Sequence, residues 1–149
     1  VHAESEIGAS NVYRVDPFTG SCDRVADDFE RPTGIAFSPG ATQLYVADSP
    51  RNHIRVFDVQ DGRSLTNGRV LVEGSVPSLD SMRLDHHGRI WIGALDGVHC
   101  YLSDGTLIGK IRTPDPTANV EFGGRRGNVL ICASTTVYSI MLTVTGLTR

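Results

Sequence analysis

The chain has 149 residues, enough for one domain, and its 40% hydrophobic and 21% charged residues exclude a disordered, collagen-like or coiled-coil protein. A formal charge of -3 gives no basic field that would attract nucleic acid, and the absence of any run of about 18 apolar residues excludes a membrane segment. We therefore expect neither nucleic acid nor a membrane as a partner.

The segment from Val1 to Gly8 lacks the basic head and the apolar stretch of a signal peptide. This composition predicts a cytoplasmic protein. Because the chain starts at Val1 rather than at a methionine, we expect this end to be processed, trimmed or cut.

Three cysteines, Cys22, Cys100 and Cys132, are an odd number with wide spacing and without a CxxC motif. This pattern predicts neither a disulfide framework nor a zinc site. Cys100 and Cys132 lie in apolar runs, so we expect both to be buried free thiols.

Sixteen glycines, seven prolines and many short Val/Ile/Tyr runs predict an all-β chain with closely spaced strands. At the front of the chain, residues 12–16 predict a strand, residues 16–20 a turn and residues 22–27 a second strand. These two strands correspond to the second half of a four-stranded unit that recurs further along the chain.

The recurring unit is recognised by its apolar runs. Three pairs of such runs occur along the chain. The first pair is Leu44–Ala47 and Ile54–Phe57, the second is Ile90–Gly93 and Val98–Tyr101, and the third lies at 129–132 and 137–140. Tyr45 and Trp91 are 46 positions apart, and Trp91 and Leu130 are 39 positions apart. A period of this length is typical of a propeller blade with four antiparallel strands.

The repeats predict a single partial β-propeller domain over residues 1–149, with two, four, four and three strands in chain order. The expected half-blade covers residues 11–27, and the blades cover residues 31–73, 79–113 and 118–142. Such an arc leaves an apolar face and unpaired strand edges at both ends. Something must therefore complete the ring.

Several segments of the chain resemble the SMP-30/gluconolactonase family, in matching order and spacing. They are Arg31–Pro39, Leu44–Asp48, Ile54–Asp58, Trp91–Gly97 and Asn119–Gly124. The resemblance implies about three four-stranded blades from the C-terminal half of a six-bladed propeller. It also implies that an N-terminal strand supplies the outer strand of the last blade, and that the family activity is metal-dependent hydrolysis of a lactone or a similar ester.

In a propeller, the residues that begin the innermost strands surround the mouth of the central channel. The internal alignment gives these positions as Thr33, Asp80 and Ala118, of which only Asp80 carries a carboxylate. The resemblance implies one Glu, one Asn and one Asp as metal ligands. The Asp falls on Asp80, Thr33 stands at the Asn position, and the Glu lies outside this chain.

We expect the metal to be a divalent cation, with Ca2+ favoured and Zn2+, Mg2+ or Mn2+ as alternatives. It would polarise a lactone carbonyl or an organophosphate oxygen and help to activate water. The alternative for Asp80 is a turn residue that caps the entry to a strand.

Two further residues are candidate substrate contacts. Asp48 ends a strand near the mouth, and Asn119 shares an inner-strand face with Glu121. The alternatives are a turn carboxylate for Asp48 and a solvated channel side chain for Asn119. His99 is expected to be a strand-face residue rather than a catalytic one, and Arg125–Arg126 a solvated hairpin pair, with anion contact as the alternative.

Two functions from different classes fit these residues. The first is a lactonase-type hydrolase for a small-molecule substrate such as a lactone, active once the propeller is completed by an N-terminal half or by a second copy in a homodimer. Two copies give 26 strands against the 24 of a six-bladed ring. The second is a truncated, non-catalytic propeller module for association or ligand binding. Tight binding of a divalent metal would favour the hydrolase, and its absence in the assembled species would favour the module.

Overall fold

The computed structural model describes residues 8–123 and 128–147, so Arg125 and Arg126 lie outside the described residues. Within this part of the chain, thirteen strands form four antiparallel sheets. The described residues include no helix with the length and apolar character needed to span a bilayer.

We name the sheets in chain order as the half-blade and blades A, B and C. The half-blade contains β1 (Ser10–Val15) and β2 (Cys22–Phe29). Blade A contains β3 (Pro32–Phe37), β4 (Gln43–Asp48), β5 (His53–Gln60) and β6 (Ser64–Glu73), with a short 3-10 turn at Pro39–Ala41. Blade B contains β7 (Met82–Leu84), β8 (Ile90–Ala94), β9 (Gly97–Tyr101) and β10 (Leu107–Arg112), and blade C contains β11 (Thr117–Gly123), β12 (Asn128–Ala133) and β13 (Thr136–Met141).

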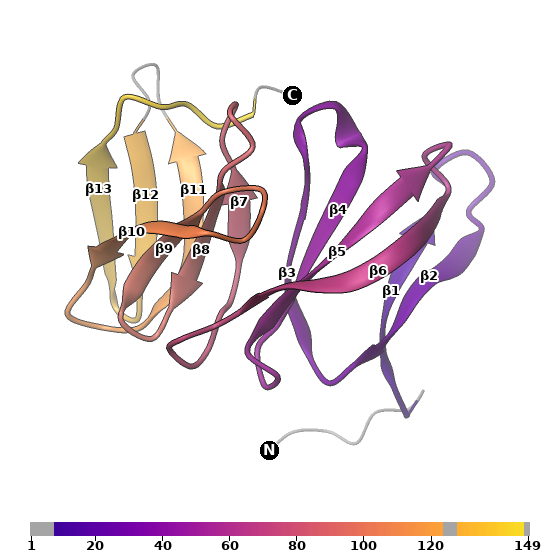
Figure 1. Cartoon of the computed structure of the whole chain (residues 1–149), viewed down its shortest axis with the longest axis horizontal. Coiled ribbons are helices and arrows are strands. Elements are labelled where there is room, and N and C mark those ends of the chain that lie inside the picture. The colour runs from indigo at the N-terminus through magenta and orange to yellow at the C-terminus, as the bar shows by residue number, and fades with distance from the viewer. Residues whose placement is uncertain (1–7, 124–127, 148–149) are drawn as a thin grey trace.

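The sheets follow one another around an arc in chain order, as Figure 1 shows. Within each sheet, every strand pairs with its neighbours in the sequence, so each blade is a meander whose first strand lies innermost. The inner strand β7 of blade B contacts both β3 of blade A and β11 of blade C.

The prediction of an all-β partial propeller is confirmed. The sheets span residues 10–29, 32–73, 82–112 and 117–141, compared with the expected ranges 11–27, 31–73, 79–113 and 118–142.

Strand β4 shows why a short apolar run becomes a central strand of a blade. Leu44 and Val46 pack toward the half-blade, whereas Tyr45 and Ala47 pack toward blade B. Successive side chains of a strand point to opposite faces, so a strand between two neighbouring sheets needs apolar residues at every position. This requirement explains the continuous run Leu44–Ala47.

Three clusters of buried side chains fill the spaces between neighbouring sheets. The cluster between blades A and B includes Tyr45, Ile54, Met82 and Ile92, all at most 1% exposed. Strand β10, on the outside of blade B, is mostly exposed. The hydrophobic core is therefore a series of layers between blades.

Both ends of the arc expose apolar side chains, as the repeat count predicted. Val15 of the half-blade is 61% exposed, and Val137 and Met141 of blade C are both 67% exposed. Cys100 is a buried free thiol as predicted, but the same prediction for Cys132 is wrong, because Cys132 is exposed. Cys132 lies in the terminal blade of the arc, where no further sheet in the described structure covers the outward face.

Candidate functional site

Asp80 lies in the connection from β6 to β7, and its backbone is fixed by blade B. The Asp80 N–H donates to the Gly93 carbonyl at 2.9 Å, and the Gly93 N–H donates to the Ser81 carbonyl at 3.1 Å. These bonds extend the pairing of β7 and β8 beyond the strands. The Asp80 side chain therefore projects from a fixed backbone segment.

Two glycines allow the inner strands to approach each other closely at this point. A Cβ atom on Gly34 of β3 would overlap the Asp80 carbonyl oxygen, and a Cβ atom on Gly93 would overlap the Thr117 carbonyl oxygen. Only glycine permits such backbone-to-backbone contact. Blades A, B and C are therefore in close contact around Asp80.

Thr33 and Asp80, the two predicted metal-site residues, lie together. The Thr33 hydroxyl is within hydrogen-bonding reach of the Asp80 carboxyl, and it lies 2.6 Å from the hydroxyl of Ser49. Ser49 in turn donates to the carbonyl of Leu79, the residue before Asp80, at 2.5 Å. A chain of hydroxyl groups thus connects blade A to the segment that carries Asp80.

Burial raises the pKa of the Asp80 carboxyl above its ordinary value, despite the opposing effects of the Thr33 hydroxyl, the Ser81 N–H and the Arg31 charge. The positive charge of Arg31 is thus close enough to influence Asp80, and the Arg31 side chain is exposed. A partly buried carboxylate at the convergence of several strands is a typical candidate for a functional site. Arg31 is a residue at this site that the sequence reasoning did not select.

The third predicted mouth position also converges on this point. The Ser81 N–H donates to the Ala118 carbonyl of β11 at 3.2 Å. Asn119, the neighbour of Ala118, is partly buried, and its Oδ1 accepts a hydrogen bond from the Val120 N–H at 2.8 Å. Asn119 therefore lies beside the Asp80 segment, and its role as a substrate contact stays a prediction.

Asp48 occupies a different environment from Asp80. Its side chain is fully buried, and its two carboxylate oxygens accept backbone hydrogen bonds from the Glu30 N–H at 2.7 Å and the Arg31 N–H at 2.9 Å. Arg51 Nε lies 3.8 Å from the same carboxylate. The structure thus shows Asp48 fixing the connection between β2 and β3, while direct substrate contact stays a prediction.

Asp48→Asn is expected to lower the free energy of unfolding by about 1 to 3 kcal/mol, because an amide replaces one of two buried acceptors for backbone N–H groups. Urea unfolding monitored by circular dichroism measures this change. Asp23→Asn, at an exposed position of β2, is the matched control and should change stability by less than about 0.5 kcal/mol. Unchanged stability together with a raised KM for a lactone would instead support the substrate-contact prediction for Asp48.

The structure adds an ion pair that connects two inner strands. Arg83 Nε of β7 lies 2.7 Å from Glu121 Oε2 of β11, and the two side chains are 36% and 55% exposed. The sequence reasoning considered Glu121 as a channel-facing residue but did not select Arg83. Pairing between residues 38 positions apart leaves no local signal in the sequence.

Two buried polar networks in blade B also escaped the sequence reasoning. Asp85 accepts hydrogen bonds from Trp91 Nε1 at 2.9 Å and Arg89 Nε at 2.7 Å. His99, a fully buried residue on β9 as its strand position predicted, lies 2.5 Å from Asp96 and 3.2 Å from the hydroxyl of Tyr101. Both networks join residues within one sheet, which indicates a structural role.

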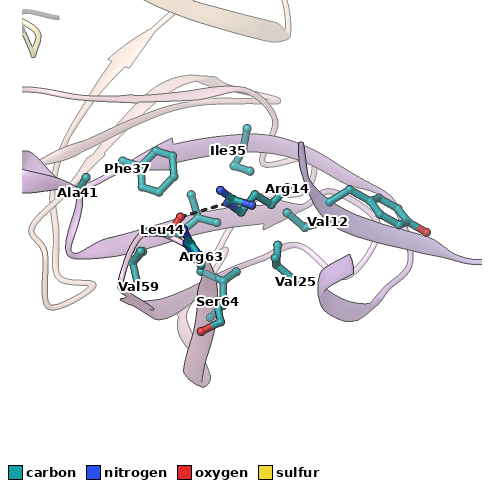
Figure 2. Close-up of a pocket in the computed structure, with 13 residues that line it drawn as sticks. Val12, Arg14, Val25, Ile35, Phe37, Ala41, Leu44, Val59, Arg63 and Ser64 are labelled. Carbon is teal, nitrogen blue, oxygen red and sulfur yellow. Dashed lines mark hydrogen bonds between the residues drawn. The ribbon is translucent and has the colours of Figure 1, made fainter. Parts of the chain in front are cut away.

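A groove lies between the half-blade and blade A (Figure 2), and Asp80 is not among its lining residues. Its volume is about 360 Å3, and Arg14 Nε at its side donates to the Gly62 carbonyl at 3.2 Å. Most of its lining is apolar and includes Val12, Val25, Ile35, Phe37, Leu44 and Val59. Its lining residues come from both strands of the half-blade and from all four strands of blade A. The groove thus lies where the half-blade meets blade A.

Hard divalent cations bind oxygen atoms, and the fit of this site can be judged by its donors. No group of three or more His, Cys, Asp and Glu side chains that could hold a metal ion occurs in residues 8–123 and 128–147. The Asp80 carboxylate and the Thr33 hydroxyl are both oxygen donors, and the hydroxyl is near enough to lower the pKa of the carboxyl. This pair fits one side of a Ca2+-type site, which needs further oxygens from elsewhere.

Comparison with known proteins identifies the family of this propeller. The model of the SMP-30/gluconolactonase/LRE-like region matches residues 2–136. The chain belongs to the SMP-30/gluconolactonase/LRE-like family. The gluconolactonase of Zymomonas mobilis is 29% identical over 148 residues, which cover 91% of this chain and 41% of that protein.

Solved structures of the family agree with the fold. A structural-genomics structure of a candidate gluconolactonase is 31% identical with a TM-score of 0.90, and it matches 99% of this chain and 50% of its own. The gluconolactonase of Xanthomonas campestris is 28% identical with a TM-score of 0.85, over 97% of this chain and 47% of its own. The SMP-30/gluconolactonase-type chain therefore spans about half the length of these relatives.

A further solved structure shares only the fold. It is a calcium-binding protein, regucalcin, from Agrobacterium tumefaciens, 24% identical with a TM-score of 0.73, and it matches 81% of this chain and 43% of its own. Calcium binding is a property of that protein. For the present chain, metal binding rests on its own residues.

Proposed function

We propose that this chain forms one side of the active site of a metal-dependent lactone hydrolase, with Asp80 and Thr33 as ligands of a divalent cation, Ca2+ being favoured. The observation that carries this proposal is the connection of Thr33, through the Ser49 hydroxyl, to the Leu79–Asp80 segment, where β7 contacts both β3 and β11. The gluconolactonases among the relatives support lactones as the substrate class.

Each residue at the site has a distinct task in this proposal. Asp80 supplies the charge that holds the cation, and Thr33 supplies a neutral oxygen. The close backbone packing at Gly34 and Gly93 keeps the Asp80 segment in place, so that the carboxylate is oriented before a ligand binds. When bound, the cation would polarise the lactone carbonyl and lower the pKa of a water molecule.

Arg31 and Asn119 are proposed to contact the substrate from opposite sides of Asp80. Arg31 belongs to the segment held by Asp48, and its exposed guanidinium can stabilise negative charge that develops on a lactone oxygen. Asn119 lies on β11 next to the carbonyl that binds the Ser81 N–H. Neither residue needs to form a covalent intermediate, since water is the nucleophile in this chemistry.

We further propose that a complementary half propeller, rather than a second copy of this chain, provides the remaining ligands. Strand β13 pairs with β12 over six residue pairs and takes the third position in blade C. Strand β1 takes the third position of its own blade, next to β2. A second copy would therefore bring two third strands to one blade.

The direct test is hydrolysis of an aldonolactone by the native assembly that contains this chain, followed in a pH-stat. Chelation with EDTA is expected to reduce the rate by at least about 100-fold, and added Ca2+ to restore it, because the cation carries several kcal/mol of transition-state stabilisation. Light scattering before and after chelation checks that the assembly remains intact. An intact assembly whose lactone hydrolysis is unaffected by EDTA, or that hydrolyses no lactone, would support the non-catalytic module instead.

A further inference from the structure

Asn52, in the loop from β4 to β5, forms three hydrogen bonds with the segment that leads into Asp80. Its backbone carbonyl accepts from the Gly74 N–H at 2.7 Å, and its Nδ2 donates to the Gly74 carbonyl at 2.8 Å. Its Oδ1 accepts from the Leu79 N–H at 3.3 Å. Gly74 follows β6 directly, and Leu79 precedes Asp80. A single side chain of blade A thus bridges the two ends of residues 74–79.

The chemistry of these two partners fixes the orientation of the Asn52 amide. The Gly74 carbonyl can only accept a hydrogen bond, and the Leu79 N–H can only donate one. The amide meets the carbonyl with its NH2 group and the N–H with its oxygen. An ionised aspartate carries no proton to donate, so it could form only one of the two bonds.

Segment 74–79 packs closely against Asn52 and against the core. A Cβ atom on Gly74 would lie 2.7 Å from Asn52 Nδ2 and 2.8 Å from its Oδ1, so this contact requires glycine. The Leu79 side chain has no exposed surface and belongs to the apolar cluster between blades A and B. Both ends of the segment are therefore fixed.

The backbone of Ser78 shows that this segment has to be held in place. Its φ is 68°, in the left-handed region that residues other than glycine rarely adopt. Such a conformation persists only where the surrounding structure enforces it. The hydrogen bond between Leu79 and Asn52 acts on the very next residue. A return of Ser78 to negative φ would change the direction of the chain that carries Asp80.

We propose that Asn52 is a positioning residue, whose amide holds segment 74–79 in the conformation that presents the Asp80 carboxylate to a divalent cation. The inference rests on the proposed function, in which Asp80 is a metal ligand. Asn52 itself is assigned no contact with the cation or the substrate. Its loss would leave Asp80 correctly oriented in only a fraction of the molecules, and the apparent metal affinity would fall by that fraction.

Asn52→Gly tests this role, because glycine accommodates the left-handed backbone at position 52, where φ is 52°, and removes the amide. In the native assembly, calorimetric titration should show about 10-fold weaker Ca2+ binding, the size of effect seen when a residue that orients a metal ligand is lost. Lactone hydrolysis at saturating Ca2+ should stay within about 2-fold of the wild type, because bound Ca2+ selects the molecules in which Asp80 is correctly oriented.

The matched control is Asn67→Gly, at another left-handed asparagine, with φ of 53°. Its Nδ2 donates to Asp58 of β5 at 2.8 Å, so the substitution also removes a side-chain hydrogen bond within blade A. It should change Ca2+ affinity by less than about 2-fold, because its partner lies outside segment 74–79. Urea unfolding checks that both variants are folded.

The outcomes separate this inference from the proposed function. Absence of Ca2+ binding by the wild-type assembly overturns both. Wild-type Ca2+ binding that Asn52→Gly leaves unchanged overturns only the role of Asn52. An equal loss of Ca2+ affinity in Asn67→Gly also overturns it, since the loss would then reflect the stability of blade A. If Asn52→Gly does not fold, Gly74→Ala provides the test, because its Cβ atom would displace the Asn52 amide, and unchanged Ca2+ affinity contradicts the inference.

Discussion

Asp80→Asn is expected to abolish lactone hydrolysis by the assembled propeller and to weaken its Ca2+ binding by more than about 100-fold, beyond the loss typical of residues that only orient a metal ligand. Asp80 is the single carboxylate at the three mouth positions Thr33, Asp80 and Ala118. Calcium affinity in proteins depends on the number of charged ligands, so removal of this carboxylate removes the main attraction that the chain supplies.

The measurements are calorimetric titration with Ca2+ and pH-stat assays of the variant and the wild type. Asp23→Asn removes a carboxylate at an exposed position in the half-blade and is the matched control for net charge. It should leave both properties unchanged. Wild-type Ca2+ affinity in Asp80→Asn would mean that Asp80 is only a turn residue.

The same substitution should have the opposite effect on the stability of the metal-free protein. Burial raises the pKa of Asp80 in the folded state, so the folded protein holds this proton more tightly than the unfolded chain. The protonated Asp80 carboxyl therefore favours the folded state. This contribution to the free energy of unfolding is lost as the pH rises through the pKa of the folded protein. At neutral pH, metal-free Asp80→Asn should therefore be at least as stable as the wild type in urea.

The fold could be predicted because its determinants are local and repeated. The runs Leu44–Ala47 and Ile90–Gly93 are apolar at successive positions, since each lies between two neighbouring sheets, and their spacing reports the length of a blade. Burial at the ends of the arc was harder to predict. Cys132 lies in an apolar run but is exposed. Its burial would require a further blade on its outward face, and the local sequence does not show whether such a blade is present.

The pairing of Thr33 with Asp80 followed from the internal alignment, because equivalent positions of successive blades converge at the channel mouth. The surrounding residues could not be found in this way. Ser49 donates a hydrogen bond to the Leu79 carbonyl, 30 residues further along the chain, and Arg83 pairs with a residue of the next blade. Such contacts depend on how blades are placed beside each other, which no local motif records.

Asp85→Ala is expected to produce the largest loss of stability, about 3 to 5 kcal/mol, because it breaks a buried ion pair and leaves the partner charge behind. The Asp85 side chain has no exposed surface, and that of Arg89 is 24% exposed. The carboxylate also accepts the backbone N–H groups of His87 at 2.9 Å and Arg89 at 3.0 Å, which close the turn between β7 and β8. Loss of this acceptor leaves Trp91 Nε1 without its partner in the core between blades B and C.

The pH dependence separates the charge of Asp85 from its size. Burial works to raise the pKa of Asp85, but the hydrogen bonds from Trp91 and Arg89 outweigh it and hold the pKa below its ordinary value. The contribution of Asp85 to stability is therefore complete above about pH 4, the ordinary range of an aspartate, and is lost as pH falls through the lower folded pKa. Asp85→Asn should be less stable than the wild type in urea at pH 7, and the difference should shrink at pH 3. A difference that stays constant between these pH values would mean that packing, rather than the charge on Asp85, holds this turn.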